Sequence, residues 1–334
     1  MMLYLHGLGH FHPENVITNR FLEDLDIGTS EEWILERVGI RTRRTVLPLD
    51  YIAATKNSDP AAAFEASLYG NAQMGAAAAR KALERAHLSP ADIGLVVAGN
   101  SSPGYASPAE ATLVAAELGI SAPCFDLTSA CTTFGVQIHF LRCMRPEALP
   151  KFALVVNPEN VTRSIDYSDR TAAVLFGDAT TAAVVSAVEP SRLRIVSSEV
   201  SSDPANWDKI VIPRMGHFRQ EGHAVQGFAI RKTTDMLRRL HAAYAGKDGN
   251  RFLFVGHQAN LGMLATVCER TGIPAECHWH NVAEYGNTAC AGVPSVLSQH
   301  WDDLRDGDRI GIAIVGAGLT WTNMMILVNG HDDL

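Results

Sequence analysis

Apolar and polar positions follow helical and strand patterns in turn along most of the chain. Residues 73–87 carry apolar side chains at helical spacing, and residues 229–246 form a second amphipathic helix that we expect to end at Gly246. Each predicted helix precedes a short apolar run typical of a buried strand, around Val96 and Val97 in one case and within 250–260 in the other. This alternation predicts an α/β fold made of βαβ units, with mainly parallel sheets covered by helices.

The same order of elements occurs twice, which indicates an internal duplication. In both copies the next helix ends in a Gly-Ile pair, at Gly119 and at Gly272, and a tight turn and a helix start follow, at 129–135 and at 285–292. The turns after the first strands are 157 residues apart (100 and 257), and the helix starts are 156 apart (131 and 287). We predict two related halves, residues 1–185 and 186–334, with a cap inserted at about 20–70 and an irregular linker at 201–227.

Composition narrows the function classes. Of 334 residues, 47% are hydrophobic, which is enough for a large core, and the net charge of −8 argues against broad binding to nucleic acid or to an anionic membrane. No run of about 18 apolar residues is present, and the first residues lack a basic stretch followed by an apolar core, so we expect a cytoplasmic protein. Six cysteines without paired CxxC spacing favour reduced thiols.

Three polar residues at the repeat-related turns carry candidate chemistry. If the two copies pack symmetrically, Cys131, His257 and Asn287 converge. Cys131 precedes a predicted helix, whose free N–H groups and dipole favour a thiolate nucleophile. A neutral imidazole and a side-chain amide can each donate a hydrogen bond to one oxygen and so stabilise an enolate beside a thioester.

Several ordered strings make the chain resemble the β-ketoacyl-acyl-carrier-protein synthase III family of the thiolase superfamily. The resemblance spans nearly the whole sequence, through TSEEWILERVGIRTRR (29–44), DLTSACTTFGVQ (126–137), DRTAAVLFGDATTAAV (169–184), GHQANL (256–261), YGNTACAGVP (285–294) and GAGLTW (316–321). It implies the five-layered α-β-α-β-α thiolase fold, with duplicated βαβαβαββ halves, and a homodimer. It also implies a Cys-His-Asn triad at Cys131, His257 and Asn287.

The resemblance further implies a decarboxylative Claisen condensation of an acyl-coenzyme A primer with a malonyl thioester on an acyl carrier protein, in fatty acid or related secondary-metabolite biosynthesis. The primer first acylates Cys131. The backbone N–H groups of Cys131 and Ala317 are the expected oxyanion hole. No metal or resident cofactor is expected, since coenzyme A enters as part of the substrate. The residues implied to contact it are Trp33, Arg37, Arg170 and, near the pantetheine arm, Asn260.

Some positions depart from the family pattern and bear on substrate choice. Ala317 replaces the middle glycine of a three-glycine turn, while Val315 and Ser107 stand where the family commonly has aromatic residues along the acyl tunnel. The smaller side chains predict a roomier tunnel for a longer or more functionalised acyl chain. A dialkylresorcinol-type ketosynthase and cyclase is therefore an alternative, with Glu159 or Glu110 as an additional acid or base.

Two other function classes stay open at this point. A simple acyltransferase or thioesterase could use Cys131 and His257 without an enolate, although the presence of Asn287 favours condensation. A non-catalytic subunit of a synthase pair is the other alternative, and the complete set of three residues argues against it.

Overall fold

Two copies of one strand and helix succession make up the body of the molecule in a computed structural model, which describes residues 1–214, 216–246 and 249–329. The end of the predicted second half, 330–334, lies outside the described residues. The first copy contains, in chain order, β1 (Leu3–Phe11), α5 (Asn71–Ala86), β4 (Leu95–Ala98), α6 (Glu110–Leu118), β5 (Cys124–Asp126), α7 (Thr133–Cys143), β6 (Ala153–Glu159) and β7 (Ala179–Ser186).

The second copy repeats this order with one strand fewer among the described residues. It contains β8 (Leu193–Ser202), α9 (Gly222–Tyr244), β11 (Phe252–Gly256), α10 (Leu261–Thr271), α12 (Gly292–Gln299), β12 (Arg309–Gly316) and β13 (Thr320–Val328). Where the first copy has β5, the second has a single parallel bridge between Phe254 and His278. The strands pair in the order β11-β12-β13-β8-β1-β7-β6-β4-β5, and the two copies meet where β1 pairs with β8.

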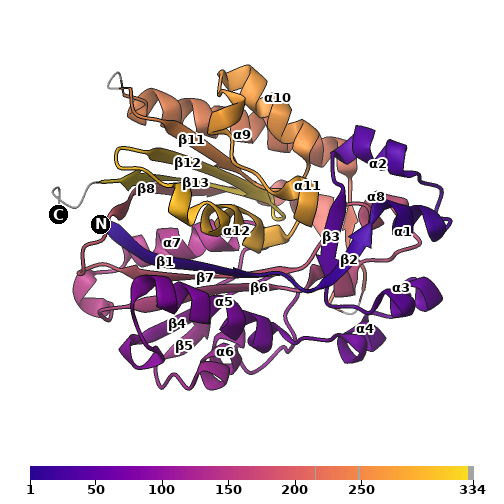
Figure 1. Ribbon diagram of the computed structural model, residues 1–334, viewed down its shortest axis with the longest axis horizontal. Coiled ribbons are helices and arrows are strands. Elements are labelled where there is room, and N and C mark those ends of the chain that lie inside the picture. Colours follow the sequence, from indigo (N-terminus) through magenta and orange to yellow (C-terminus); the bar gives the residue numbers. More distant parts are fainter. Residues whose placement is uncertain (215, 247–248, 330–334) are drawn as a thin grey trace.

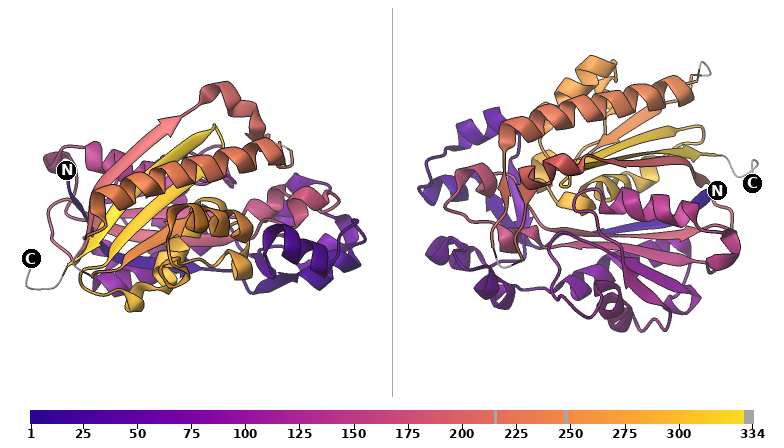
Figure 2. Two further views of the ribbon diagram at one scale, coloured as in Figure 1. Left: turned by 90° about the horizontal axis from the view of Figure 1, so that it is seen from above. Right: turned by 180° about the vertical axis from the view of Figure 1, so that it is seen from behind.

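Five layers result from this pairing (Figure 1). Helices α5 and α6 cover the outer face of the first half sheet, and α9 and α10 cover the outer face of the second. Figure 2 shows α9 extending along that second outer face. Between the half sheets lie α7, which contacts β6, β8 and β13, and α12, which contacts β1, β7 and β11. Separate clusters of buried apolar side chains fill the spaces between the layers.

A cap of short elements covers one end of the layered body (Figure 1). It comprises β2 (Asn15–Thr18), α1 (Asn19–Asp24), α2 (Glu31–Val38), β3 (Thr42–Thr45), α3 (Leu49–Thr55), α4 (Pro60–Ala66) and the later helix α8 (Arg170–Ala173). Strands β2 and β3 form their own antiparallel pair. The cap therefore lies against the ends of the strands where the predicted site residues occur.

The Gly-Ile pairs end their helices as the sequence predicts. Gly119 caps α6 and Gly272 caps α10, each with φ of +70°. A left-handed residue at this position costs glycine little because it has no Cβ, so this pair of residues is a dependable helix-stop signal. Their agreement confirms the predicted alignment of the two copies at α6 and α10.

The predicted linker at 201–227 and the limits of the following helix need correction. Within 201–227 the chain forms a 3₁₀ segment at Pro204–Lys209 and the short antiparallel strands β9 (Ile210–Val211) and β10 (Arg219–Gln220). Helix α9 already begins at Gly222 and ends at Tyr244, not at Gly246. Two glycines and several exposed side chains in its first turns weaken the amphipathic pattern there, which explains the late predicted start.

Within the described ranges, none of the helices combines the length and the apolar character required to cross a bilayer. The expectation of a cytoplasmic location stays a prediction.

Candidate active site

Cys131 lies on a tight elbow between β5 and α7. The preceding residue, Ala130, has φ of +46°, a left-handed conformation that turns the chain sharply before the helix begins at Thr133. Thr133 holds the elbow: its hydroxyl accepts a hydrogen bond from the N–H of Ser129 (2.8 Å) and donates one to the carbonyl oxygen of Ala130 (2.7 Å). The elbow fixes a half-buried thiol immediately before a helix N-terminus.

The end of β12 packs directly against this thiol residue. A Cβ added to Gly316 would lie 3.0 Å from the Cβ of Cys131 and 3.3 Å from its backbone nitrogen. Glycine therefore lets the strand approach the elbow without the tight contacts that a Cβ would make. The approach places the turn after Gly316, which includes the half-buried Ala317, beside the N–H side of the elbow.

Two effects of the surroundings act on the pKa of the Cys131 thiol. Burial, and secondly the negative charge of Glu159, raise the pKa of the Cys131 thiol to about 12. Both effects oppose the stabilisation of a thiolate by the helix N-terminus that the sequence analysis expects.

His257 follows β11 and is a neutral imidazole. Its backbone N–H donates to the carbonyl oxygen of Ala313 in β12 (3.0 Å), which ties it to the same strand that reaches Cys131. Burial lowers the pKa of the ring to about 4, and Nδ1 is buried without a hydrogen-bond partner among the described residues. This agrees with the neutral hydrogen-bond donor that the sequence predicts.

Asn287 is buried in the turn before α12 and its side-chain orientation is fixed. Its Oδ1 accepts the backbone N–H of Ala289 (3.0 Å), so the NH₂ group is the part of the amide left to donate to a ligand. Its backbone bonds on both sides to the cap connection, accepting from the N–H of Gly177 (3.1 Å) and donating to the carbonyl oxygen of Leu175 (2.8 Å). The turn is therefore held from two directions.

Two residues that the sequence did not single out support these turns. Gln258 donates to the carbonyl oxygen of Gly256 and accepts the N–H groups of Asn281 and Val282, and so links the His257 turn to the segment leading to Asn287. Arg43 is fully buried and donates to the carbonyl oxygen of Val174 and to Oδ1 of Asn19. Its side chain also packs against Gly286, which has φ of +68°.

These contacts bring the three predicted residues to one region. Cys131 touches Gly316 of β12, and His257 is bonded to Ala313 of the same strand. The Asn287 turn carries Cys290, whose thiol donates to Glu159 (3.1 Å), the carboxylate that acts on Cys131.

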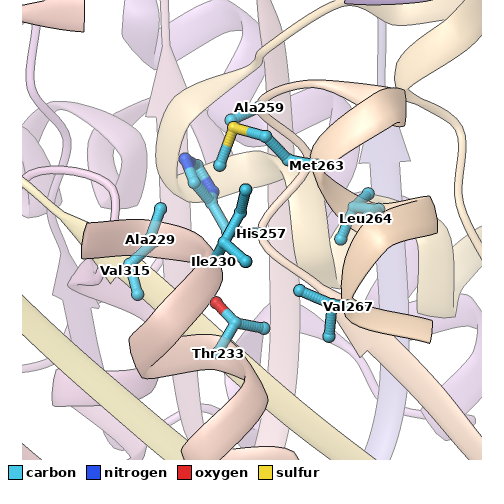
Figure 3. Close-up of a pocket in the computed structure, with 9 residues that line it drawn as sticks. All are labelled: Ala229, Ile230, Thr233, His257, Ala259, Met263, Leu264, Val267 and Val315. Atoms are coloured by element: carbon cyan, nitrogen blue, oxygen red, sulfur yellow. The ribbon is translucent and has the colours of Figure 1, made fainter. Parts of the chain in front are cut away.

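A small pocket opens beside His257 (Figure 3). It has a volume of about 10 Å³, room for roughly one water molecule, and three segments supply its lining: α9, the stretch from the His257 turn into α10, and the end of β12. Figure 3 shows the His257 imidazole directed toward Ala259 and Met263, with Val315 on the β12 side. The structure thus brings Val315 to the predicted site but leaves Ser107 exposed in the loop before α6.

The residues implied to hold coenzyme A lie on the cap side. The guanidinium carbons of Arg170 and Arg37 lie 5.0 and 5.9 Å from the centre of the Trp33 ring, so the aromatic face meets two cations. Asn260 caps α10 by accepting the N–H of Met263 (3.1 Å), and it donates to the carbonyl oxygen of Arg37 (3.2 Å). It therefore joins the helix that lines the pocket to the cap helix that carries Trp33.

Comparison with known proteins identifies the family. The profile described as 3-oxoacyl-[acyl-carrier-protein (ACP)] synthase III matches residues 125–204, and its C-terminal counterpart matches residues 250–328. The β-ketoacyl-[acyl-carrier-protein] synthase III of Rhizobium meliloti (strain 1021) is 31% identical over 334 residues, 96% of this chain and 97% of that protein. The chain belongs to the β-ketoacyl-[acyl-carrier-protein] synthase III family. It is accordingly a condensing acyltransferase of fatty acid or related biosynthesis.

Solved structures of synthase III enzymes agree with this membership and confirm the thiolase fold. The enzyme from Aquifex aeolicus VF5 superposes with a TM-score of 0.85 at 28% identity, covering 97% of this chain and 99% of that one. The enzyme from Pseudomonas aeruginosa PAO1 also gives 0.85, at 29% identity and 99% coverage of both chains. The priming β-ketosynthase of the R1128 polyketide pathway gives 0.83 at 26% identity, with coverage of 98% and 96%.

Cys290 of this synthase III chain was not singled out from the sequence, because the two copies were aligned at the wrong register. By backbone conformation the partner of Cys131 is Cys290 and not Asn287: Ala289 has φ of +45°, nearly the value at Ala130. The elbows are therefore 159 residues apart (131 and 290). The signal was present as the Ala-Cys pair in both TSACT and NTACA.

Proposed function

We propose that this chain condenses an acyl thioester with a malonyl thioester through an acyl-Cys131 intermediate, with loss of carbon dioxide. The proposal is supported by the setting of three groups from the two halves. They are the elbow thiol of Cys131, packed on Gly316 of β12, the buried imidazole of His257, whose backbone is bonded to Ala313 of the same strand, and the oriented amide of Asn287. A nucleophile alone serves acyl transfer, whereas two neutral donors beside it suit a developing enolate oxygen.

In the first half-reaction the Cys131 sulfur attacks the carbonyl carbon of the primer thioester. The backbone N–H groups of Cys131 and Ala317 stabilise the oxyanion, which is supported by the close packing of the Gly316 turn on the elbow. The bond from the carbonyl carbon to the primer sulfur then breaks, and the thiol proton of Cys131 ends on the departing thiol.

In the second half-reaction a malonyl thioester loses carbon dioxide and leaves an enolate. His257 and Asn287 donate hydrogen bonds to its oxygen, and the enolate carbon attacks the acyl-Cys131 carbonyl. The bond from that carbonyl carbon to the Cys131 sulfur breaks, the β-ketoacyl thioester leaves, and the sulfur takes up a proton from water to restore the Cys131 thiol. His257 is suited to this step because burial keeps its pKa at about 4, so that it is a neutral donor at physiological pH.

The substrates assigned to this site are an acyl-coenzyme A primer and a malonyl thioester on an acyl carrier protein, with no resident cofactor. The paired cations on Trp33 support a nucleotide site, because the adenine ring stacks on an aromatic face and phosphates pair with guanidinium groups. The expected cellular location is the cytoplasm.

We also propose a homodimer in which Ser107 of one copy faces the acyl tunnel of the other. Strand β5 is the edge of the sheet, Phe125 on it is 42% exposed, and Tyr105 in the loop that carries Ser107 is 56% exposed. An open edge with exposed aromatic side chains is suited to pairing with a second copy. Sedimentation velocity should give twice the chain mass, and Phe125→Lys should shift it toward one chain; a single-chain mass for the unaltered protein would contradict the dimer.

The condensation is tested by supplying acyl-coenzyme A primers of increasing length together with a malonyl thioester on coenzyme A or on the carrier protein. The expected result is release of carbon dioxide coupled to formation of a β-ketoacyl product, with the carrier-bound malonyl group preferred. Primer hydrolysis or transfer to another acceptor without carbon dioxide would instead establish a plain acyltransferase and overturn the proposal.

The same assay examines the nucleotide contact. Trp33→Ala should raise the KM for the coenzyme A primer by about tenfold, because one aromatic stacking surface is lost, and should leave kcat nearly unchanged. Trp207→Ala, which removes an aromatic residue that is 65% exposed, is the matched control and should leave both constants unchanged. An unchanged KM for Trp33→Ala would place the nucleotide elsewhere.

A further inference from the structure

The two halves differ in how their long helices cover the sheet. In the first half α5 packs on β1, β7 and β6, and a Cβ added to Gly9 of β1 would lie 1.9 Å from the carbonyl oxygen of Ala78 in α5. Glycine in β1 therefore lets α5 lie directly on the strand. In the second half α9 packs on β12, β13 and β11, and β8 contains no glycine. The outer face of β8 is less covered as a result, and residues 197–202 of this strand are half-buried or exposed.

A groove lies between α9 and the two strands β8 and β13. Its volume is about 390 Å³, which is the size of a small-molecule site. Ser201 and Trp321 line it from the strands, and Lys232, Asp235, Arg238 and Arg239 line it from the helix. The groove can therefore hold a ligand larger than a single phosphate ion.

The groove is separate from the pocket beside His257. Helix α9 lines that pocket with Ala229, Ile230 and Thr233, and none of these residues lines the groove. The groove residues 232, 235 and 239 are spaced three and four apart, which places them together on another face of the helix. One helix thus borders two hollows.

Positive charge is concentrated in this groove, although the net charge of the chain is −8. Among its described lining residues three are cations and only Asp235 is a carboxylate. Lys232 and Arg238 form no ion pair with another described residue; Arg238 donates one hydrogen bond to the carbonyl oxygen of Arg270 (3.0 Å). Arg239 lies 3.5 Å from Glu199, but both side chains are exposed and such a pair is weak. The positive charge is available to an anion.

An aromatic ring lies beside these cations. The ammonium group of Lys232 is 4.1 Å from the centre of the Trp321 ring, and the ring of Phe228 meets the indole edge-on at 5.6 Å. These contacts fix the half-buried indole and hold the ammonium group at the groove. Trp33 and its two arginines form the same combination of an aromatic face with cations. Such a combination suits a ligand that carries both a planar ring and phosphate groups.

We propose that the groove between α9 and β8 binds a nucleotide with a diphosphate group, at a site separate from Trp33. The phosphates pair with the three cations, and the base lies against Trp321. The Asp235 carboxylate and the Ser201 hydroxyl accept hydrogen bonds from the ribose hydroxyls. The adenosine diphosphate group occurs both in free ADP and in coenzyme A, so either compound is a possible source. The inference goes beyond the condensation reaction and does not depend on it.

Equilibrium dialysis with radiolabelled ADP tests this site by counting the molecules bound per chain. We expect two for the unaltered protein, one in the groove and one at Trp33, and one for Trp33→Ala. Adding Lys232→Gln and Arg239→Gln to Trp33→Ala should weaken the remaining binding by at least about tenfold, because two charged partners of the phosphates are lost. Arg231→Gln is the matched control: it removes an exposed cation of α9 that does not line the groove, and it should leave binding unchanged.

A single site that disappears in Trp33→Ala would overturn the proposal, as would binding that survives the loss of both Lys232 and Arg239. A single site that persists in Trp33→Ala and is lost with these two cations would support it. An unchanged unfolding temperature of the variants shows that lost binding is not lost folding.

Two further ligands identify what the groove accepts. In Trp33→Ala, competition of coenzyme A with ADP would show that the groove takes the nucleotide of either compound, and absence of competition would restrict it to the free nucleotide. Binding of the acyl carrier protein, and not of ADP, through Lys232 and Arg239 would overturn the nucleotide and assign the groove to an acidic protein. Because no condensation is measured, these results do not depend on the proposed function.

Discussion

Replacing Cys131 by alanine should abolish the acyl-enzyme and lower condensation by at least about 10³-fold. The elbow presents this thiol to the Gly316 turn, and the equivalent thiol of Cys290 is buried against Glu159. No second sulfur in the described structure has the same setting, so the loss of Cys131 should not be compensated. Incubation with an acyl-coenzyme A primer followed by mass spectrometry of the intact protein measures the adduct.

Cys143→Ala is the control for this substitution. Cys143 lies at the other end of α7, its thiol is exposed, and it plays no part in the proposed chemistry, so the adduct and the turnover should persist. Cys131→Ala should also keep the ability to release carbon dioxide from the malonyl thioester, because His257 and Asn287 remain in place. An acyl adduct of undiminished mass and rate in Cys131→Ala would show that another residue is the nucleophile.

The succession of strands and helices could be predicted because it depends on local signals. Gly119 and Gly272 end equivalent helices through the same left-handed backbone, and the short apolar runs at β4 and β11 are typical of buried strands. The reduced strand of the second copy left no such signal, because the bridge between Phe254 and His278 depends on tertiary packing. The start of α9 at Gly222 also lacks a local signal, because the first turns of the helix are only weakly amphipathic.

The candidate site was predictable in its residues and not in its electrostatics. Cys131, His257 and Asn287 stand in recognisable strings, and the neutral imidazole follows from burial at a strand end. The raised pKa of Cys131 does not follow from the helix that succeeds it. Its causes are desolvation and the charge of Glu159, which is 28 residues further along the chain and is brought near the elbow only by the fold. Helix position alone therefore does not determine the pKa of this cysteine.

Replacing His257 or Asn287 by alanine should separate the two half-reactions. Each variant should lower decarboxylation of the malonyl thioester by about 10²- to 10³-fold, the usual cost of removing one donor from an oxyanion site, while Cys131 still becomes acylated. The amide of Asn287 is oriented by the N–H of Ala289, and the imidazole of His257 is buried and neutral, so each donor is fixed before the malonyl group arrives. Carbon dioxide release and the mass of the acyl-enzyme measure the two steps independently.

The pH dependence of the unfolding temperature tests the lowered pKa of the His257 ring. Its pKa is about 4 in the folded protein and about 6.5 when unfolded, so the unfolded chain binds the proton more readily. The resulting contribution to stability is complete above pH 6.5 and is lost as the pH falls toward 4, and His257→Asn should flatten this part of the curve of unfolding temperature against pH. His223→Ala, at an exposed position in the first turn of α9, should change neither this curve nor decarboxylation.

The separation of the two half-reactions would be contradicted by an equal loss of acylation and decarboxylation in His257→Ala. That result would mean that the imidazole acts on Cys131 itself and not on the enolate alone.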